Sequence, residues 1–324
     1  MILILSETGD VTTYHVMRWL EWYGKEVMLV TDKHPISNIC IGNRHTSLCV
    51  DGKLLDFSKV TAYWYRRGNF AIPGYQGGDN LPPLIRDNIA NEAQTVITLL
   101  HSRLRNIPHL GSYGERKVNR LKVMDTAAAL GLEVPAYGVF NSREQVADFV
   151  AAYGRVVTKP LSDGLIVEED RISYANYTSL FGPEDVDALP DTFMPGLFAA
   201  YVPKKYELRI FYLDGVCYTM AIMSQQDTQT QTDMRRYNYA KPNRNVPYQL
   251  PAAVSANIHA LMKALELKTG SVDMIVTPDD KFIFLEVNPV GQFGNVSSNC
   301  HYHLEQKVAD YLINIAFLKT GHNV

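Results

Sequence analysis

The stretch Gly270-Ser-Val-Asp-Met-Ile-Val-Thr-Pro-Asp-Asp-Lys-Phe-Ile-Phe-Leu-Glu-Val-Asn-Pro289 contains two apolar runs separated by a polar turn. Runs of this length, interrupted by Pro278-Asp-Asp280, are typical of two neighbouring strands joined by a tight connection. We therefore predict strands at Ser271–Thr277 and Phe282–Asn288, paired as a hairpin.

Oxygen-bearing side chains gather on one face of this predicted hairpin. Alternation along the second strand sends Glu286 and Asn288 to the same face. Leu285 and Val287 then point to the opposite, apolar face, and Asp273 can lie across from Glu286. Three such side chains suit Mg²⁺, a hard cation that completes its shell with phosphate oxygens and water. The alternative is a solvated edge hairpin with chance acidic residues, for which an Asn-Pro ending is unusual.

A second candidate element is Val156-Val-Thr-Lys159-Pro, an apolar strand that ends in a lysine. Lys159 precedes the glycine-containing loop Ser162-Asp-Gly164 and can reach phosphate oxygens as a point charge. A solvated lysine at a strand end is the alternative. Residues 165–174 resemble a hairpin arm, and residues 162–174 are interpreted as a lid that could cover the phosphates.

A third element is the predicted strand Tyr206–Leu213. Glu207 and Arg209 share one of its faces, where a carboxylate can bind ribose hydroxyls and a guanidinium can bind an anion. A salt bridge to a neighbouring strand is the equally weighted alternative. Farther along, residues 225–245 are polar and are interpreted as a loop that orders on binding.

The composition indicates a folded protein with no excess of basic charge. The chain has 324 residues, of which 46% are hydrophobic and 20% charged, and its formal net charge is -3. This composition excludes disorder as the main state. It also gives no electrostatic case for a nucleic-acid partner, because no basic surplus exists to neutralise phosphates.

No apolar run approaches the ~20 residues that span a bilayer, so we expect no membrane partner. The apolar start Met1–Ser6 is strand-sized and lacks a basic lead, which favours a buried strand over a signal peptide. Four scattered cysteines show no metal-ligand spacing. We expect reduced thiols and a cytoplasmic location.

The order of predicted elements indicates an α/β (α+β) protein with three parts. Residues 1–112 alternate between strands and helices, which favours a mostly parallel sheet, with Thr46–Val50 as one strand. Residues 113–197 form a central part with the lid. Residues 198–324 are rich in antiparallel strands and contain the magnesium cluster. The predicted helices are Thr12–Tyr23, Leu84–Leu104, Val118–Leu130, Arg143–Tyr153, Ala252–Leu265 and Leu304–Lys319.

These motifs, in this order along nearly the whole chain, resemble those of the ATP-grasp superfamily. The motifs that carry the resemblance are Asn119-Arg-Leu-Lys122, Gly131-Leu-Glu-Val-Pro135, Thr158-Lys-Pro160, Glu207-Leu-Arg209, Asp273 and Phe284-Leu-Glu-Val-Asn-Pro289. The resemblance implies an ATP-grasp fold, with residues 1–112 as the preceding domain and the other two parts as central and C-terminal lobes.

Three further stretches narrow the resemblance to the graspetide synthetases, and within them to the grasp-with-spasm peptide maturases. They are Trp64-Tyr-Arg-Arg-Gly68, Asp233-Met-Arg-Arg-Tyr-Asn238 and the extension Val290-Gly-Gln-Phe293. Such enzymes use ATP and Mg²⁺ to activate Asp or Glu side chains of a ribosomally made precursor peptide, consisting of leader and core, as acyl phosphates. Thr, Ser or Lys side chains then close ω-ester or ω-amide rings. The related maturases tend to be homodimers, and the helix Leu84–Leu104 is a plausible interface.

The resemblance assigns roles by position. Asp273, Glu286 and Asn288 would hold magnesium, with Asn288 also touching the nucleotide. Lys159 would contact the phosphates and Glu207 the ribose, while Ala200, Tyr201 and Val202 would form the hinge that faces adenine. Arg209, with Arg235 or Arg236, would bind the acyl phosphate or the substrate carboxylate.

Two positions depart from the family pattern. Many members have a lysine where this chain has Arg120, which keeps the charge and can contact phosphate through two N–H groups. Lys122 is the alternative if the geometry requires a lysine. In the hinge, Ala199 and Ala200 replace the usual polar side chains, so adenine recognition would depend more on the backbone.

Two other functions use the same motifs. One is an ATP-grasp ligase that acts on a protein C-terminus or a small molecule, and the other is an inactive nucleotide-dependent module that binds a peptide. No dedicated general base is evident. His301 and His303 could form a metal site, but a structural or hydrogen-bonded pair is the favoured interpretation.

Overall fold

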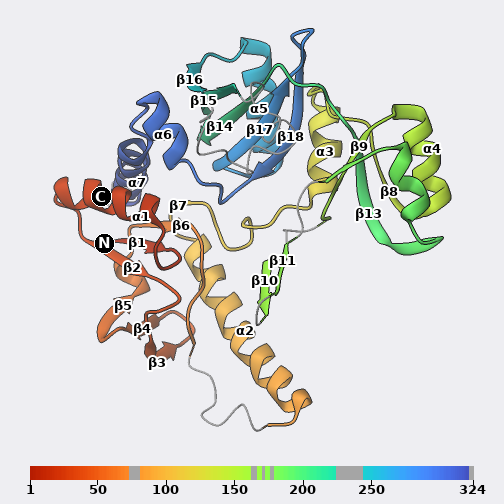
Figure 1. Ribbon diagram of the computed structural model, residues 1–324. Coiled ribbons are helices and arrows are strands. Elements are labelled where there is room, and N and C mark those ends of the chain that lie inside the picture. Colours follow the sequence, from red (N-terminus) through yellow and green to blue (C-terminus); the bar gives the residue numbers. More distant parts are fainter. Residues whose placement is uncertain (73–80, 162–165, 170–171, 176–178, 224–243, 321–324) are drawn as a thin grey trace. The chain divides into compact units, whose positions relative to one another are not determined.

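The computed structural model describes residues 1–72, 81–161, 166–169, 172–175, 179–223 and 244–320 (Figure 1). The chain divides into two compact units. Unit 1 contains Met1–Lys117, Leu267–Thr269 and Pro289–Val324, and unit 2 contains Val118–Glu266 and Gly270–Asn288. The predicted boundaries at residues 112 and 197 did not anticipate that the chain after Asn288 groups with the N-terminal residues. Those boundaries stay a prediction.

Unit 1 is built on a four-stranded parallel sheet, as the alternating strands and helices predicted. The strand order is β2-β1-β6-β7, and β1 pairs in parallel with both β2 and β6. The strands are β1 (Ile2–Leu5), β2 (Val27–Val30), β6 (Ala62–Tyr65) and β7 (His109–Leu110).

Helices cover this sheet. Helix α2 (Pro83–Arg105) contributes buried side chains to the core that includes Leu3 and Tyr63. Helix α7 (Leu304–Thr320) contacts β6, β7 and helix α1 (Val11–Trp22). A short helix, α6 (Gly294–Cys300), precedes α7. The helices predicted in this unit are therefore confirmed to within a few residues.

The segment between β2 and β6 corrects the sequence analysis. The strand Thr46–Val50 was assigned to the parallel sheet, but it is β4 of a separate antiparallel sheet in the order β3-β4-β5. Its neighbours are β3 (Ile36–Ile41) and β5 (Lys53–Asp56), and the 3-10 helix η1 (Phe57–Lys59) follows. Asp51 and Gly52 both have positive φ in the tight turn from β4 to β5, which is typical of a two-residue hairpin turn.

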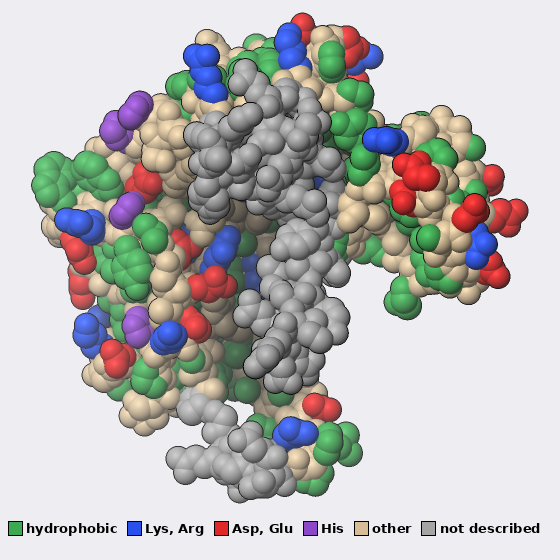
Figure 2. Space-filling model, in the orientation of Figure 1, with side chains coloured by type: hydrophobic (Ala, Val, Ile, Leu, Met, Phe, Trp, Pro, Cys, Tyr) green, Lys and Arg blue, Asp and Glu red, His purple; other side chains and the backbone are tan. Residues whose placement is uncertain are grey.

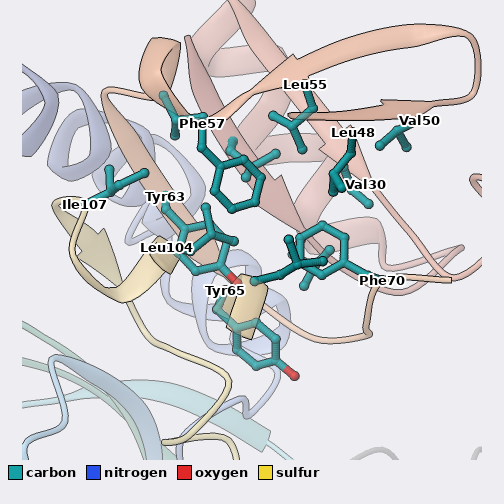
Figure 3. Packing of buried hydrophobic residues seen from close by; sticks show 14 of the residues in the cluster. Val30, Leu48, Val50, Leu55, Phe57, Tyr63, Tyr65, Phe70, Leu104 and Ile107 are labelled. Carbon is teal, nitrogen blue, oxygen red and sulfur yellow. The ribbon is translucent and has the colours of Figure 1, made fainter. Parts of the chain in front are cut away.

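This small sheet completes the core of unit 1. Leu48, Val50 and Leu55 are buried against Tyr63 and Phe57, together with side chains of α2 (Figure 3). The antiparallel sheet and α2 thus contribute apolar side chains to one shared core, together with Tyr63 and Tyr65 of β6.

Unit 2 contains a four-stranded antiparallel sheet in the order β12-β9-β13-β8. Helix α4 (Arg143–Tyr153) packs on it through Val146 and Val150, and Ser142 caps this helix as predicted by accepting a hydrogen bond from the Gln145 N–H. The 3-10 helix η3 (Pro183–Ala188) packs beside α4. The strands are β8 (Tyr137–Ser142), β9 (Val156–Lys159), β12 (Ser179–Phe181) and β13 (Thr192–Ala200).

A second antiparallel sheet of unit 2, in the order β16-β15-β14-β17-β18, contains the predicted hairpin. Asp214 and Gly215, with φ of 41° and 100°, form the predicted turn between β14 and β15. Helices α3 (Arg120–Ala129) and α5 (Ala252–Ala264) contact each other, and α3 contacts β18. The strands are β14 (Tyr206–Leu213), β15 (Val216–Met223), β16 (Arg244–Tyr248), β17 (Thr269–Val276) and β18 (Phe282–Asn288).

On the face drawn in Figure 2, acidic and basic side chains of the described residues are interspersed. This distribution agrees with the small net charge of -3. Among the described residues, no helix combines the length and the hydropathy that crossing a membrane requires.

Two motifs of the sequence, Trp64–Gly68 and Val290–Phe293, meet inside unit 1. The Arg66 guanidinium donates hydrogen bonds to the backbone carbonyls of Val290 and Gly291. The neighbouring Arg67 donates through Nη2 to the Val290 carbonyl at 2.9 Å. Arginines at the end of β6 therefore hold the segment that follows β18 in the chain.

The contact is buried and extends to the start of α1. Arg66 is 3% exposed and lies 3.4 Å from the Asp10 carboxylate, with its guanidinium over the Phe293 ring. Gln292 Nε2 donates to Asp10 at 3.2 Å, and Gln292 Oε1 accepts from Thr12 at 2.9 Å. Burial lowers the pKa of Arg66 to about 10, so this side chain remains charged at neutral pH.

We predict that Arg66→Met destabilises unit 1 by about 3–5 kcal/mol, because it leaves the Asp10 carboxylate buried without its cation. The three tryptophans, Trp19, Trp22 and Trp64, all belong to unit 1. Urea unfolding followed by tryptophan fluorescence therefore measures the stability of this unit directly.

Arg67→Met is the matched control. Arg67 shares the Val290 carbonyl but is partly exposed, so its loss is expected to cost only about 1–2 kcal/mol. Equal losses for the two variants would contradict the role assigned to the buried pair of Arg66 and Asp10.

Candidate active site

A cavity of about 320 Å³ lies in unit 2, between its two large sheets and helix α3. Its volume is in the range of small-molecule sites. All candidate site residues that the structure describes line this cavity, and they are Arg120, Lys159, Ala200, Tyr201, Val202, Glu207, Arg209, Asp273, Glu286 and Asn288. Segments up to 168 positions apart in the sequence thus converge on one site, although their individual roles stay predictions.

The pairing of β17 with β18 sets the acidic end of the cavity. Asp273 is directly opposite Glu286, and Ser271 is opposite Asn288. The three candidate magnesium residues therefore belong to adjoining strands in the register that the sequence predicted.

The predicted alternation fails at one residue of β18. The register passes from Asp273↔Glu286 to Met274↔Phe284, which leaves Leu285 without a partner in a β-bulge. Leu285 lines the cavity together with Glu286, so its assignment to the opposite face was wrong. Val287, which is 6% exposed, is buried as expected. Bulges of this kind redirect side chains beside active sites.

Each carboxylate of the cavity has a cation of the chain beside it. Arg209 Nη1 donates to Asp273 Oδ2 at 2.9 Å, the cross-strand ion pair considered as an alternative for this arginine. Glu207 accepts from the ammonium group of Lys204, which is only 9% exposed. The sequence analysis missed Lys204. In the sequence, Lys204 is marked only by its position just before the strand that contains Glu207. Lys205 has the same position, so the sequence could not distinguish the two lysines.

Burial raises the pKa of Asp273 to about 6. The Arg209 guanidinium acts in the opposite direction, and the carboxylates of Glu286 and Glu207 add to the increase. A carboxyl group this destabilised in its charged form is typical of a site built to hold a cation.

Arg120 reaches the same end of the cavity from helix α3, which Asn119 caps by accepting from the Lys122 N–H. Arg120 Nη2 lies 3.4 Å from the Glu286 carboxylate, and Nη1 donates to the backbone carbonyl of Pro160. Lys122 is exposed on α3 and is not among the lining residues. Of the two candidates on this helix, only Arg120 is therefore in position to act in the cavity.

The predicted hinge follows β13 at one wall of the cavity. The Ala200 N–H donates to the Ala136 carbonyl, and the Tyr201 N–H donates to the Arg155 carbonyl. These two N–H groups are therefore already used within the fold. Apolar side chains, including Met124 and Leu208, complete the lining.

Several predicted features are only partly covered by the described residues. Arg235 and Arg236 lie outside them. The predicted hairpin arm is confirmed, since β10 (Ile166–Glu169) pairs with β11 (Ile172–Ala175) in antiparallel fashion. The remaining residues of the predicted lid lie outside the described part of the chain.

The side-chain oxygens of Asp273, Glu286 and Asn288 suit a metal ion that also binds phosphate oxygens. In the described part of the chain, no three His, Cys, Asp or Glu side chains gather as a metal site. Two carboxylates and one amide match the few oxygen ligands that Mg²⁺ takes from protein when phosphates supply others. His301 lies in the left-handed conformation at the end of α6, and nothing in the structure pairs it with His303 as a metal ligand.

We predict that Asp273→Asn stabilises the protein relative to wild type as the pH rises, measured by scanning calorimetry with a chelator present. The folded-state pKa of about 6 lies above the ordinary aspartate value of 3.8, so protonation of Asp273 favours the folded state. In the wild type, protonated Asp273 stabilises the fold fully below pH 3.8, and this contribution is lost as the pH rises through about 6. The relative gain for the Asn variant should be on the order of 1–2 kcal/mol between pH 4 and pH 7.

Asp279→Asn provides a control of opposite sign. A hydrogen bond from the Thr277 hydroxyl lowers the pKa of Asp279, so its contribution is present at neutral pH and is lost as the pH falls. The Asn variant should therefore become relatively less stable as the pH rises. The same pH trend in both variants would contradict the raised pKa of Asp273.

Comparisons with known proteins place this cavity in context. No protein-family model matches the chain, and no curated protein sequence matches it. Among solved structures, a RiPP-associated ATP-grasp ligase from Chryseobacterium gregarium, in complex with ADP and a leader and core peptide, has a TM-score of 0.83 at 25% identity. The match covers 97% of this chain and 96% of that one.

Two more structures have the same fold. The macrocyclase MdnC from Microcystis aeruginosa, bound to precursor peptide MdnA, has a TM-score of 0.81 at 26% identity, with 97% and 99% of the two chains covered. The ATP-grasp ligase PsnB, in complex with minimal precursor, Mg and ADP, has a TM-score of 0.74 at 16% identity, with 97% and 98% covered. The fold, the convergence of the motifs on one cavity and these similarities identify the chain as an ATP-grasp ligase.

Proposed function

We propose that this enzyme uses Mg-ATP to activate Asp or Glu side chains of a ribosomally made precursor peptide and closes ω-ester or ω-amide rings. The observation that carries the proposal is the likeness, over 97% of the chain, to two ligases solved with precursor peptides bound. The extension Val290–Phe293, which carried the resemblance to peptide maturases, supports it further because it is held in the buried contact with Arg66.

The acidic end of the cavity fits Mg²⁺. Asp273 and Glu286 would supply carboxylate oxygens and Asn288 an amide oxygen, all from two paired strands. Mg-ATP, when bound, supplies the phosphoryl group that converts a carboxylate, a poor electrophile, into an acyl phosphate.

The remaining residues of the cavity would bind and orient the reactants. Lys159, at the end of β9, and Arg120 would balance the charge of the phosphates. Glu207, oriented by Lys204, would accept hydrogen bonds from the ribose hydroxyls. Arg209 would stabilise the acyl phosphate or the substrate carboxylate, as the charge around the transferred group grows.

The partner is proposed to be a peptide with a leader and a core. Arg235 and Arg236, in the polar segment of residues 225–245, would contact the reacting carboxylate. A ribosomally made substrate and ATP are both available in the cytoplasm, which is the location we propose.

The direct test is to incubate the enzyme with ATP, Mg²⁺ and the peptide encoded beside its gene, and to follow the peptide by mass spectrometry. Each ring should appear as the loss of one water, with one ADP released. ADP release that requires a free amino acid would favour a small-molecule ligase instead. Peptide binding without peptide-stimulated ADP release would indicate an inactive module.

We predict that Asp273→Asn and Glu286→Gln each lower the rate of ring formation by at least about 100-fold, because each removes a negatively charged oxygen that would hold the metal on the phosphates. Circular dichroism should show that both variants keep the fold. Glu144→Gln, an exposed change on α4 in the same unit, is the matched control and should keep the wild-type rate. Near wild-type rates for both cavity variants would overturn the magnesium assignment.

We also propose that the protein is a homodimer that uses the first half of α2. Leu84 and Ile85 are 81% and 46% exposed, and the buried residues of this helix begin only at Ile97. Large apolar side chains exposed in the first turn of a long helix are typical of a surface that a second subunit covers.

We predict that Leu84→Glu combined with Ile85→Glu converts the dimer to a monomer, because it places charges in an apolar contact. Sedimentation velocity measures the change. Arg86→Glu, on the same turn of α2, changes the charge without removing apolar surface and serves as the control. A monomeric wild-type protein would contradict the proposal.

A further inference from the structure

The cations of the cavity do not all have the same freedom. Arg209 is on β14, beside the strand of its partner Asp273, and Lys204 is three residues from its partner Glu207. Arg120 comes from a helix and pairs with Glu286 across the cavity. Of these three ion pairs, this is the one whose cation stands on a helix, outside the sheet of its partner.

Arg120 also contacts a second element. While Nη2 faces the Glu286 carboxylate at 3.4 Å, Nη1 donates to the Pro160 carbonyl directly after β9. The planar guanidinium can hold two partners at once, whereas an ammonium group is a single point of charge. Two partners keep the arginine beside Glu286 more firmly than the ion pair alone would.

The position of this charge conflicts with a bare divalent cation on Glu286. A unit charge within about 5 Å of a divalent ion is repelled by several kcal/mol at an effective dielectric constant of about 20. The acidic pair of Asp273 and Glu286 is already offset by Arg209 and Arg120, so little net negative charge remains to attract the metal. Nucleotide phosphates change this balance, because their oxygens accept hydrogen bonds from Arg120 and also coordinate Mg²⁺.

We propose that Arg120 makes metal binding at Glu286 conditional on the nucleotide. The Glu286–Arg120 ion pair excludes the metal alone, and phosphate oxygens release Glu286 by taking over the guanidinium. This inference rests on the proposed Mg-ATP site and adds an order of binding to it. An enzyme with this property does not accumulate free divalent metal in the cavity between turnovers.

The test uses Mn²⁺, whose free aqueous form is counted by electron paramagnetic resonance, in the full-length protein. Without nucleotide, Arg120→Ala and Arg120→Gln should each bind Mn²⁺ at least about tenfold more tightly than wild type, because repulsion at Glu286 is removed. The same variants should bind ADP in the presence of Mn²⁺ more weakly than wild type. The changes in opposite directions separate this role from simple loss of a phosphate contact.

Three controls make the result specific. Lys122→Ala, an equal loss of charge on the exposed side of α3, should leave metal binding as in wild type. Arg120→Lys keeps the charge and should still exclude the metal. The gain in Mn²⁺ affinity should disappear in the double variant Arg120→Ala with Glu286→Gln. Any Mn²⁺ that this variant still binds measures the weak sites elsewhere on the surface.

The outcomes distinguish the two proposals. Suppose that the wild type binds Mn²⁺ in the presence of ADP. If the Arg120→Ala and Arg120→Gln variants then gain no affinity for Mn²⁺ alone, or if the gain remains in the variant that also lacks Glu286, the role of Arg120 is wrong and the Mg-ATP site stands. If wild type binds no Mn²⁺ with ADP, the proposed function itself fails. Thermal unfolding of every variant shows that the comparison is made on folded protein.

Discussion

The pairing of β17 with β18 is the constraint on which the site depends. A register with Asp273 opposite Glu286 brings two carboxylates together on one sheet face, an arrangement that is unfavourable unless positive charge is close. Arg209 and Arg120 provide that charge from two other elements. The bulge at Leu285 is part of the same arrangement, since it turns an apolar side chain into the cavity beside an acid.

The raised pKa of Asp273 and the ion pairs both reflect the crowding of carboxylates in the cavity. Burial disfavours the charged form of Asp273, and each of the three carboxylates of the cavity has a cation of the chain beside it. A buried carboxylate without such a partner would cost several kcal/mol. The ion pairs therefore limit the destabilising effect of these acidic groups on the protein.

Local patterns predicted much of the fold and the composition of the cavity. Apolar spacing located helices such as Arg143–Tyr153, and the turn residues Asp214 and Gly215 located a hairpin. The ten candidate residues described by the structure came from motif order and strand alternation, and they converge. Three features could not be predicted from the sequence because they depend on tertiary contacts. Periodicity cannot reveal the bulge at Leu285, local propensity does not choose the sheet of β4, and nothing near Gln292 in sequence indicates its contact with Asp10.

The contact of Arg66 with Val290 lies at a special position in the sheet of unit 1. In the strand order β2-β1-β6-β7, the direction of chain progression reverses between β1 and β6. Doubly wound sheets hold their ligands in the crevice outside the carboxyl ends of such strands. Here Arg66, at the end of β6, and Asp10, beyond the end of β1, bind the backbone and the side chain of the segment Val290–Gln292. The position that a ligand takes in other doubly wound sheets is thus filled here by a segment of the same chain, which Arg66 and Asp10 hold in place.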